Sequence, residues 1–166
     1  RKGTVVVNMA LVRRGEYEQC ADAIGRVFEQ GYSMGQLVGL LGPGERLNDT
    51  VIPGDAVGLC TVCSITLNGV LLKHGIPTAS RFGGLVELRD RRPNRFVEMI
   101  HYDGTSIDPL EVFIRAGMTD YHGAIRDGNG LIGASFREMP EDSTDLIEHL
   151  SQRLTAIGLG AFMIIG

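Results

Sequence analysis

The sequence predicts an α+β fold in which helices cover a β-sheet. Strand and helix patterns alternate along the chain, and a strand, a helix and a second strand follow one another near each end. The 166 residues, 43% of them hydrophobic and 22% charged, suit one globular domain with a core of its own. We therefore expect a single domain over residues 1–166. Periodicity leaves open whether its sheet is mixed or antiparallel.

The first β-α-β succession opens the chain. Thr4 to Val12 is rich in valine and predicts a strand, and Gln36 to Leu41 predicts a second strand before the turn Gly42-Pro-Gly44. Between them, Glu16 to Gln30 predicts a helix ended by Gly31. Its apolar residues recur at intervals of three and four, as expected of one buried helix face: Tyr17, Cys20, Ala21, Ile24, Val27 and Phe28.

A second β-α-β succession closes the chain. Leu131 to Phe136 predicts a strand, Ser143 to Ala156 a helix, and Ala161 to Ile165 a last strand. Shorter patterns fill the middle of the chain. They predict a strand at Ala56 to Leu59, a helix at Ser64 to His74 closed by Gly75 and Pro77, and strands at Leu85 to Leu88 and Phe96 to Tyr102.

A short helix is expected to begin at Asp108. Asp108 is suited to cap the helix, Pro109 to its first turn, and Glu111 has the spacing of a capping box. Asp108 and Glu111 also have the residue types of an acid/base pair. Capping accounts for their spacing without any catalytic role.

Composition excludes several classes of protein. A net charge of −4 argues against this segment binding nucleic acid by itself. No apolar run approaches the roughly 20 residues of a membrane-spanning helix. Three cysteines without a secretory leader do not indicate a disulfide framework, so we expect a cytoplasmic location. The opening Arg1-Lys-Gly3, which lacks Met, leads us to expect a fragment of a longer protein.

Glycine is unusually frequent. The chain has 23 glycines, about twice the usual frequency of about 7%. Many backbone positions are therefore expected to turn tightly or to approach a neighbour closely. Gly128-Asn-Gly-Leu-Ile-Gly133 matches the dinucleotide-binding pattern GxGxxG, but it leads into an apolar strand and not into a helix. We interpret it as a turn.

Cys60 and Cys63 form a CxxC motif between a predicted strand and a predicted helix. A helix N-terminus favours a thiolate, so one hypothesis is a cysteine-dependent enzyme or a dithiol redox protein. The alternative is two small buried residues at a tight junction. A structural zinc site would require a second pair of ligands, and the histidines are scattered, as expected of surface or satisfied residues: His74, His101, His122 and His149.

Hydroxyl groups gather at the same helix start. Thr61, Ser64 and Thr66 lie where a helix leaves N–H groups unpaired, and such a terminus binds anions. The alternative is that Ser64 or Thr66 only caps its own helix. Both interpretations stay open at the level of sequence.

A carboxylate ligand would also need a guanidinium group. Arg81 is the first candidate, because it lies in Ser80-Arg-Phe-Gly-Gly84 just after this helix, where glycines let a backbone pass close to a ligand. Arg137 and Arg95 are second choices, since both adjoin the ends of predicted elements.

Several longer motifs resemble the regulatory domain of the archaeal NrpR nitrogen repressors. The similarity runs over nearly the whole chain, from the strand containing Asn8 to Ile164-Ile-Gly166. The motifs that carry it are Thr61-Val-Cys-Ser-Ile-Thr66, Asn68-Gly-Val-Leu-Leu-Lys-His-Gly-Ile-Pro77, Ser80-Arg-Phe-Gly-Gly84, Gly104-Thr-Ser-Ile-Asp-Pro-Leu-Glu-Val-Phe-Ile114 and Phe136-Arg-Glu-Met-Pro140.

This resemblance implies a two-layer α/β sandwich of the ferredoxin-like plait type, in agreement with the two β-α-β successions. It implies a non-enzymatic sensor of 2-oxoglutarate that acts as a homodimer and needs no other cofactor or metal. DNA would be bound only through a separate winged-helix domain. Because 2-oxoglutarate carries two carboxylates and a ketone, the chemistry of the ligand favours one set of binding residues: Thr61, Cys63, Ser64, Thr66, Arg81 and Arg137.

Overall fold

A computed structural model describes residues 3–160 and 163–166 of the chain. The chain divides into two compact units, each described here by itself. Unit 1 comprises Arg1–His74 and Thr144–Gly166, and unit 2 comprises residues 75–143. Each unit holds helices and a three-stranded antiparallel sheet. The predicted α+β class is confirmed, and of the two kinds of sheet left open the antiparallel one is found.

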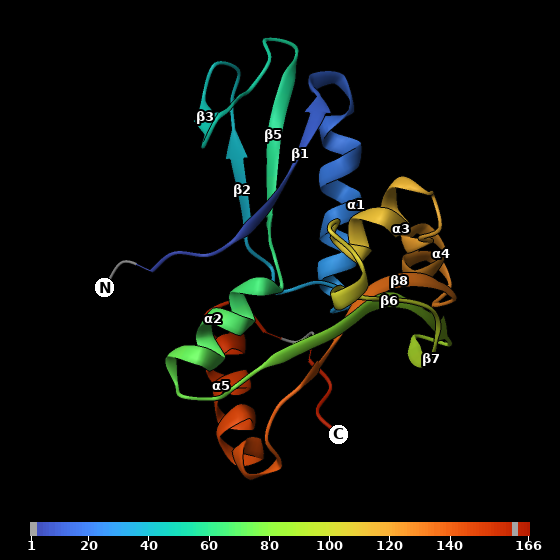
Figure 1. Cartoon of the computed structure of the whole chain (residues 1–166). Helices are drawn as coiled ribbons and strands as arrows, with labels where there is room; N and C mark the ends of the chain where they lie inside the picture. The colour runs from blue at the N-terminus through green and yellow to red at the C-terminus, as the bar shows by residue number, and fades with distance from the viewer. Residues whose placement is uncertain (1–2, 161–162) are drawn as a thin grey trace. The chain divides into compact units, whose positions relative to one another are not determined.

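The sheet of unit 1 has the strand order β1-β5-β2 (Figure 1). Strands β1 (Val7–Arg13) and β2 (Val38–Leu41) both pair antiparallel with β5 (Ala56–Val62), so they run parallel to each other on either side of it. Helix α1 (Tyr17–Glu29) joins β1 to β2. The first β-α-β prediction is confirmed in the split form that characterises ferredoxin-like folds.

Strand β5 is the central strand of this sheet, and its sequence explains why. Five of its seven residues are buried, as expected of an apolar strand covered on both faces. At Gly58 a Cβ atom would come within 2.7 Å of Ile52 Cδ1, so glycine lets the Ile52 side chain lie directly on the strand. Ile52 follows a small hairpin of β3 (Arg46–Leu47) and β4 (Thr50–Val51) that the periodicity did not predict.

The helices of unit 1 lie close to their predicted positions. A 3-10 turn at Arg14–Glu16 precedes α1, and the helix ends where Gly31, at φ +73°, donates from its N–H to Phe28 O. Helices α2 (Ile65–Lys73) and α5 (Thr144–Ala156) each bury an apolar stripe. The buried residues are Leu67 and Leu71 of α2 and Ile147, Leu150 and Leu154 of α5.

The second predicted β-α-β succession does not form in the described part of the chain. The strand at 131–136 exists as β8 (Gly130–Glu138), but it pairs with a strand of unit 2, whereas α5 belongs to unit 1. Of the last predicted strand, residues 161 and 162 lie outside the described residues, and residues 163–165 have no strand structure. Periodicity identifies a strand and a helix separately, but it contains no information on the partner with which either one packs.

The sheet of unit 2 has the strand order β7-β6-β8, with β6 (Ala79–Arg89) between β7 (Arg92–His101) and β8. Both neighbours are antiparallel to β6, and β6 and β7 are longer than the strands predicted at 85–88 and 96–102. A 3-10 turn at Tyr102–Gly104 follows β7. Another 3-10 turn, at Glu141–Ser143, follows β8.

Helices α3 (Pro109–Arg115) and α4 (Tyr121–Arg126) contact this sheet. A Cβ atom at Gly83 would come within 2.8 Å of Pro109 Cβ, so this glycine allows α3 to lie directly on β6. Asp108 accepts a hydrogen bond from Leu110 N–H at 2.8 Å, which confirms the predicted cap. Glu111, the other member of the considered acid/base pair, forms an ion pair with Arg115 at 2.6 Å.

Candidate functional site

Thr66 is tied to the backbone that leads into β1. Its Oγ1 accepts a hydrogen bond from Val6 N–H at 2.9 Å and donates to Val6 O at 3.3 Å, and the residue is 8% exposed. The Val6 carbonyl also accepts from Cys63 N–H at 2.8 Å. The hydrogen bonds between β1 and β5 therefore continue for one more residue, to Val6, and the Thr66 hydroxyl provides two of them.

The start of α2 keeps the other predicted ligand residues close together. Thr61 and Cys63 are half-buried at the end of β5, and Ser64 precedes the first helical residue. The Ser64 side chain makes no capping hydrogen bond, so Ser64 does not cap α2 in the way that the sequence allowed. Thr66 N–H donates to Cys63 O and Leu67 N–H to Ser64 O, both at 3.0 Å, which satisfies two N–H groups of the first turn.

Cys60 has an environment opposite to that of a reactive thiol. It is a buried residue of β5, and this burial raises the pKa of its thiol. A nucleophile or a redox dithiol needs the thiolate and therefore a lowered pKa. For Cys60, the structure favours the interpretation as a small buried core residue.

Arg81 and Arg137 lie at one end of unit 2. Arg137 pairs in register with Ser80, and Arg81 occupies the irregularity that follows in the ladder of β6 and β8. Arg81 Nε donates to Glu138 Oε2 at 2.5 Å, with both side chains about half exposed. A shallow depression of about 380 Å³ adjoins them, lined by Pro77, Thr78, Ala79, Glu138, Met139 and Pro140.

The predicted ligand set therefore consists of two groups. Thr61, Cys63, Ser64 and Thr66 lie in unit 1 around the start of α2, and Arg81 and Arg137 lie together in unit 2. Each group is brought together within its own unit. Which of these residues contact an effector stays a prediction.

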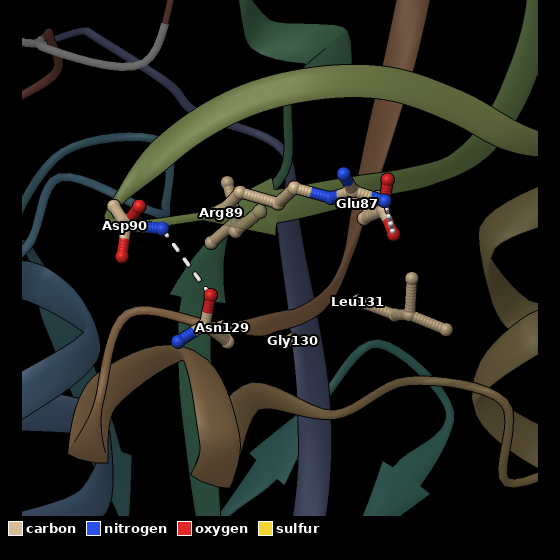
Figure 2. A pocket seen from close by; sticks show the side chains of 7 residues that line it. Glu87, Arg89, Asp90, Asn129, Gly130 and Leu131 are labelled. Carbon is tan, nitrogen blue, oxygen red and sulfur yellow. Dashed lines mark hydrogen bonds and ion pairs between the residues drawn. The ribbon is translucent and has the colours of Figure 1, made fainter.

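A larger depression, of about 470 Å³, lies at the other end of the unit 2 sheet (Figure 2). Two carboxylates line it, those of Glu87 and Asp90. Glu87 accepts hydrogen bonds from Asn94 at 2.7 Å and from Arg89 at 3.1 Å, and it lies 3.4 Å from Arg95 Nε. These contacts hold the pKa of Glu87 below its usual value, the Asn94 hydrogen bond contributing most. Arg95, a second-choice ligand in the sequence, thus contacts Glu87 here.

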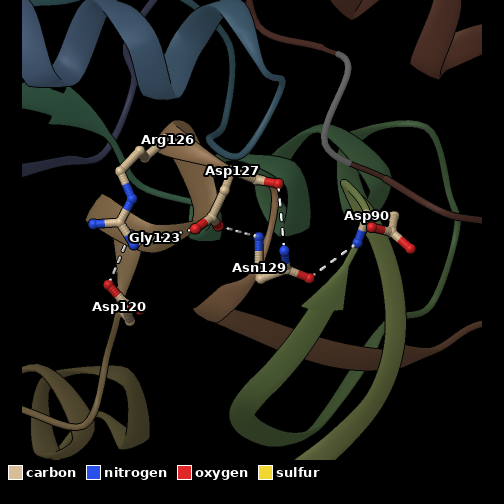
Figure 3. A network of polar contacts seen from close by, with 6 residues as sticks. All are labelled: Asp90, Asp120, Gly123, Arg126, Asp127 and Asn129. Atoms are coloured by element: carbon tan, nitrogen blue, oxygen red, sulfur yellow. Dashed lines mark hydrogen bonds and ion pairs between the residues drawn. The ribbon is translucent and has the colours of Figure 1, made fainter.

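A chain of polar contacts fixes the loop beside this depression (Figure 3). Asn129 Oδ1 accepts from Asp90 N–H at 3.2 Å, and Asp127 Oδ1 accepts from Asn129 N–H at 3.0 Å. The Asn129 contact, followed by that of Arg126 at 3.1 Å, lowers the pKa of Asp127. Asp120 caps α4 by accepting from Gly123 N–H at 2.8 Å. The polar side chains of this loop are therefore held in defined positions.

Sequence reasoning did not select this second depression. The interpretation of Gly128-Asn-Gly as a turn holds, because it leads into β8. Gly128 has φ +83° and lies against the β6–β7 turn. The signal for it in the sequence is the arginine-rich stretch 89–95.

Among the described residues no group of three or more histidine, cysteine, aspartate or glutamate side chains could hold a metal ion. The described helices also include none that is long and apolar enough to cross a lipid bilayer.

The comparisons place the chain in a class of regulatory domains. Residues 1–166 match a family model described as "NrpR regulatory domains NRD1 and 2". The chain belongs to this family of archaeal nitrogen regulators, so the resemblance seen in its motifs is confirmed. Its relatives are named as regulators, and this confirms the expectation that the chain is part of a regulator and not of an enzyme.

Named relatives and one solved structure agree with this assignment. The Global nitrogen regulator NrpRI of Methanosarcina mazei is 30% identical over 165 residues, which cover 99% of this chain and 50% of that protein. The Global nitrogen regulator NrpR of Methanococcus maripaludis is 35% identical over 149 residues, which cover 90% of this chain and 26% of that protein. The chain thus spans half or less of these relatives.

The crystal structure of a nitrogen repressor-like protein from Methanococcus jannaschii has the same fold. It superposes with a TM-score of 0.70 at 25% identity and covers 90% of this chain and 59% of that one. The fold described above is therefore shared with an experimentally determined repressor-like protein.

Proposed function

We propose that this chain is the effector-sensing domain of a cytoplasmic transcriptional repressor of nitrogen-assimilation genes, and that its effector is 2-oxoglutarate. The match of the family model to the whole chain carries this proposal. The regulator is a homodimer that binds DNA through a separate winged-helix domain. Effector binding changes the affinity of that domain for its operators.

The chemistry of two groups of residues supports 2-oxoglutarate as the effector. The start of α2 presents the helix N-terminus together with Thr61, Cys63 and Ser64, and a helix N-terminus attracts a carboxylate. Arg81 and Arg137 provide guanidinium groups, whose planar fork matches carboxylate oxygens. Arg81 already holds a carboxylate, that of Glu138, at 2.5 Å. Binding at Arg81 therefore exchanges one carboxylate for another.

Titration of the full-length regulator with 2-oxoglutarate tests the effector. Ligand that binds only the native state raises stability with concentration, by about 2.7 kcal/mol at one hundred times Kd. We expect a rise in melting temperature with 2-oxoglutarate and a smaller one with glutarate, which lacks the ketone. No rise at saturating millimolar 2-oxoglutarate would contradict the proposed effector.

Two variants of unit 2 test the site. We expect R81A to weaken 2-oxoglutarate binding several-fold. The loss is smaller than the about 1.5–3 kcal/mol of one charge-assisted hydrogen bond, because in the free protein Arg81 makes such a bond to Glu138. R115A is the matched control, since Arg115 is also an exposed arginine in an ion pair, with Glu111. Equal affinities of R81A, R115A and the wild type would place the effector site elsewhere.

A further inference from the structure

Strand β2 lies at one edge of the unit 1 sheet (Figure 1). Its four residues pair with β5, and among the described residues no strand pairs with its other side. An edge strand presents N–H and C=O groups to which a further strand can bond. The sheet of unit 1 can therefore be extended at β2.

The side chains at this edge are apolar and exposed. Leu37, Val38 and Leu40 have exposed fractions of 46%, 43% and 53%. Because successive side chains of a strand point to opposite faces of the sheet, Val38 and Leu40 lie on one face and Leu37 lies on the other. Exposed apolar residues that are grouped in this way mark interaction sites. Apolar surface thus borders the outer side of β2 on both faces of the sheet.

The outer side of β2 also lacks the charges that usually keep edge strands from associating. The edge strands β1, β7 and β8 each contain charged residues, which are Arg13 in β1, Arg92, Arg95 and Glu98 in β7, and Arg137 and Glu138 in β8. By contrast, residues 30–44, which include β2, contain no charged residue. Of these four edge strands, β2 is the one most open to pairing with another strand.

A second copy of β2 fits this edge. In a two-fold dimer both copies contribute the same surface, so that surface must be complementary to itself. Two copies of an edge strand related by a two-fold axis through the sheet run antiparallel, and one residue position then faces its own copy. Like charges that face each other across strands are destabilising, and residues 30–44 have none. The exposed side chains Leu37, Val38 and Leu40 become covered on both copies.

We propose that β2 pairs antiparallel with β2 of a second copy of this chain, and that this pairing forms the dimer interface of the regulatory domain. The inference rests on the proposed function, which requires a homodimer but assigns no interface to it. The two three-stranded sheets then join into one continuous sheet. Val38 pairs with Thr61 of β5. The interface therefore lies one strand away from the residues at the start of α2 that are proposed to bind the effector.

Cysteine variants of the full-length regulator test the pairing. Directly opposed residues of antiparallel strands have Cα atoms about 4.5–5.5 Å apart, a separation that a disulfide can bridge. L37C, V38C, L40C and L41C each test one position as the residue that faces its own copy. V38C/L40C tests an axis at Gly39, where a cysteine itself would crowd Cys60, whose Cβ lies 3.3 Å from the position of an added Cβ.

After oxidation we expect a dimer band on a denaturing gel without reductant, strongest for one of these variants. I114C is the matched control, because Ile114 is also an exposed apolar residue, 60% exposed, but lies in unit 2. The wild type gives the background from its own three cysteines. A dimer band from none of the β2 variants overturns the inference, and is the result expected if a different domain of the same chain covers β2. An equally strong band from I114C overturns it as well.

The variant L40K tests the interface without oxidation. A lysine on an edge strand opposes pairing, so we expect the dissociation constant of the dimer, measured by sedimentation, to rise about tenfold or more. I114K should leave this constant unchanged, and melting temperatures show that both variants are folded. An unchanged dissociation constant in L40K overturns the inference. The response to 2-oxoglutarate is measured in the same samples. A dimer bridged through β2 that does not respond to 2-oxoglutarate contradicts only the proposed effector.

Discussion

At the scale of single residues, Thr66 shows how a side chain chosen for ligand chemistry can serve the backbone. Its hydroxyl both accepts from and donates to Val6, the residue before β1. The local sequence around a threonine at a helix start is the same whether its side chain binds an anion, caps the helix or bonds to a neighbouring strand. The distinction depends on Val6, which is 60 positions away in sequence. Periodicity and spacing contain no information about such a contact.

Replacing Thr66 by valine separates these roles. T66V keeps the shape and removes the hydroxyl, so we expect the free energy of unfolding to fall by about 1 kcal/mol. T66S keeps the hydroxyl and is the control for its loss. Urea denaturation measures stability, and calorimetry measures the affinity for 2-oxoglutarate. If T66V leaves the urea midpoint unchanged and only weakens 2-oxoglutarate binding, Thr66 is a ligand residue and its bond to Val6 contributes little.

At the scale of secondary-structure elements, the bounds of those helices that are defined by local sequence were predicted closely. The apolar stripe and Gly31 gave the bounds of α1 to within one residue at each end, and Asp108 gave the start of α3. The hairpin at Arg46–Val51 was missed because its strands have only two residues each. The pairing of β8 with β6 was missed because it depends on contacts between distant positions.

The loop after α4 makes a prediction about pH. The N–H of Asn129, followed by Arg126, lowers the pKa of Asp127 below its ordinary value of 3.8. A depressed folded-state pKa contributes stability above the unfolded value, and this contribution is lost as pH falls through the folded pKa. We therefore expect D127N to have a lower urea midpoint than the wild type at pH 6. The gap should narrow as the pH falls below 3.8. A gap that stays constant between pH 6 and pH 3 would show that the ionised carboxylate does not stabilise this loop.

At the scale of the whole molecule, sequence motifs identified the family more fully than the site. Long motifs such as Ser80-Arg-Phe-Gly-Gly84 run through the chain, and the family model matches all of it. The ligand residues were chosen by chemistry alone, and the structure places them in two compact units. A division of this kind arises from many weak contacts between distant residues, so no local pattern in the sequence marks it.

The proposed coupling between effector and DNA predicts a reciprocal effect in the full-length repressor. If 2-oxoglutarate raises the Kd for operator DNA by a certain factor, operator DNA must raise the Kd for 2-oxoglutarate by the same factor, because both follow from one coupling free energy. A coupling of 1–3 kcal/mol corresponds to a factor of about 5–150. Calorimetric titration of 2-oxoglutarate with and without saturating operator measures this factor directly. Fluorescence anisotropy of labelled operator measures it from the other side. We expect R81A to lower the affinity for 2-oxoglutarate but to bind operator as the wild type does in its absence. Operator-bound repressor that binds 2-oxoglutarate as tightly as free repressor would contradict the coupling, even if the effector itself binds.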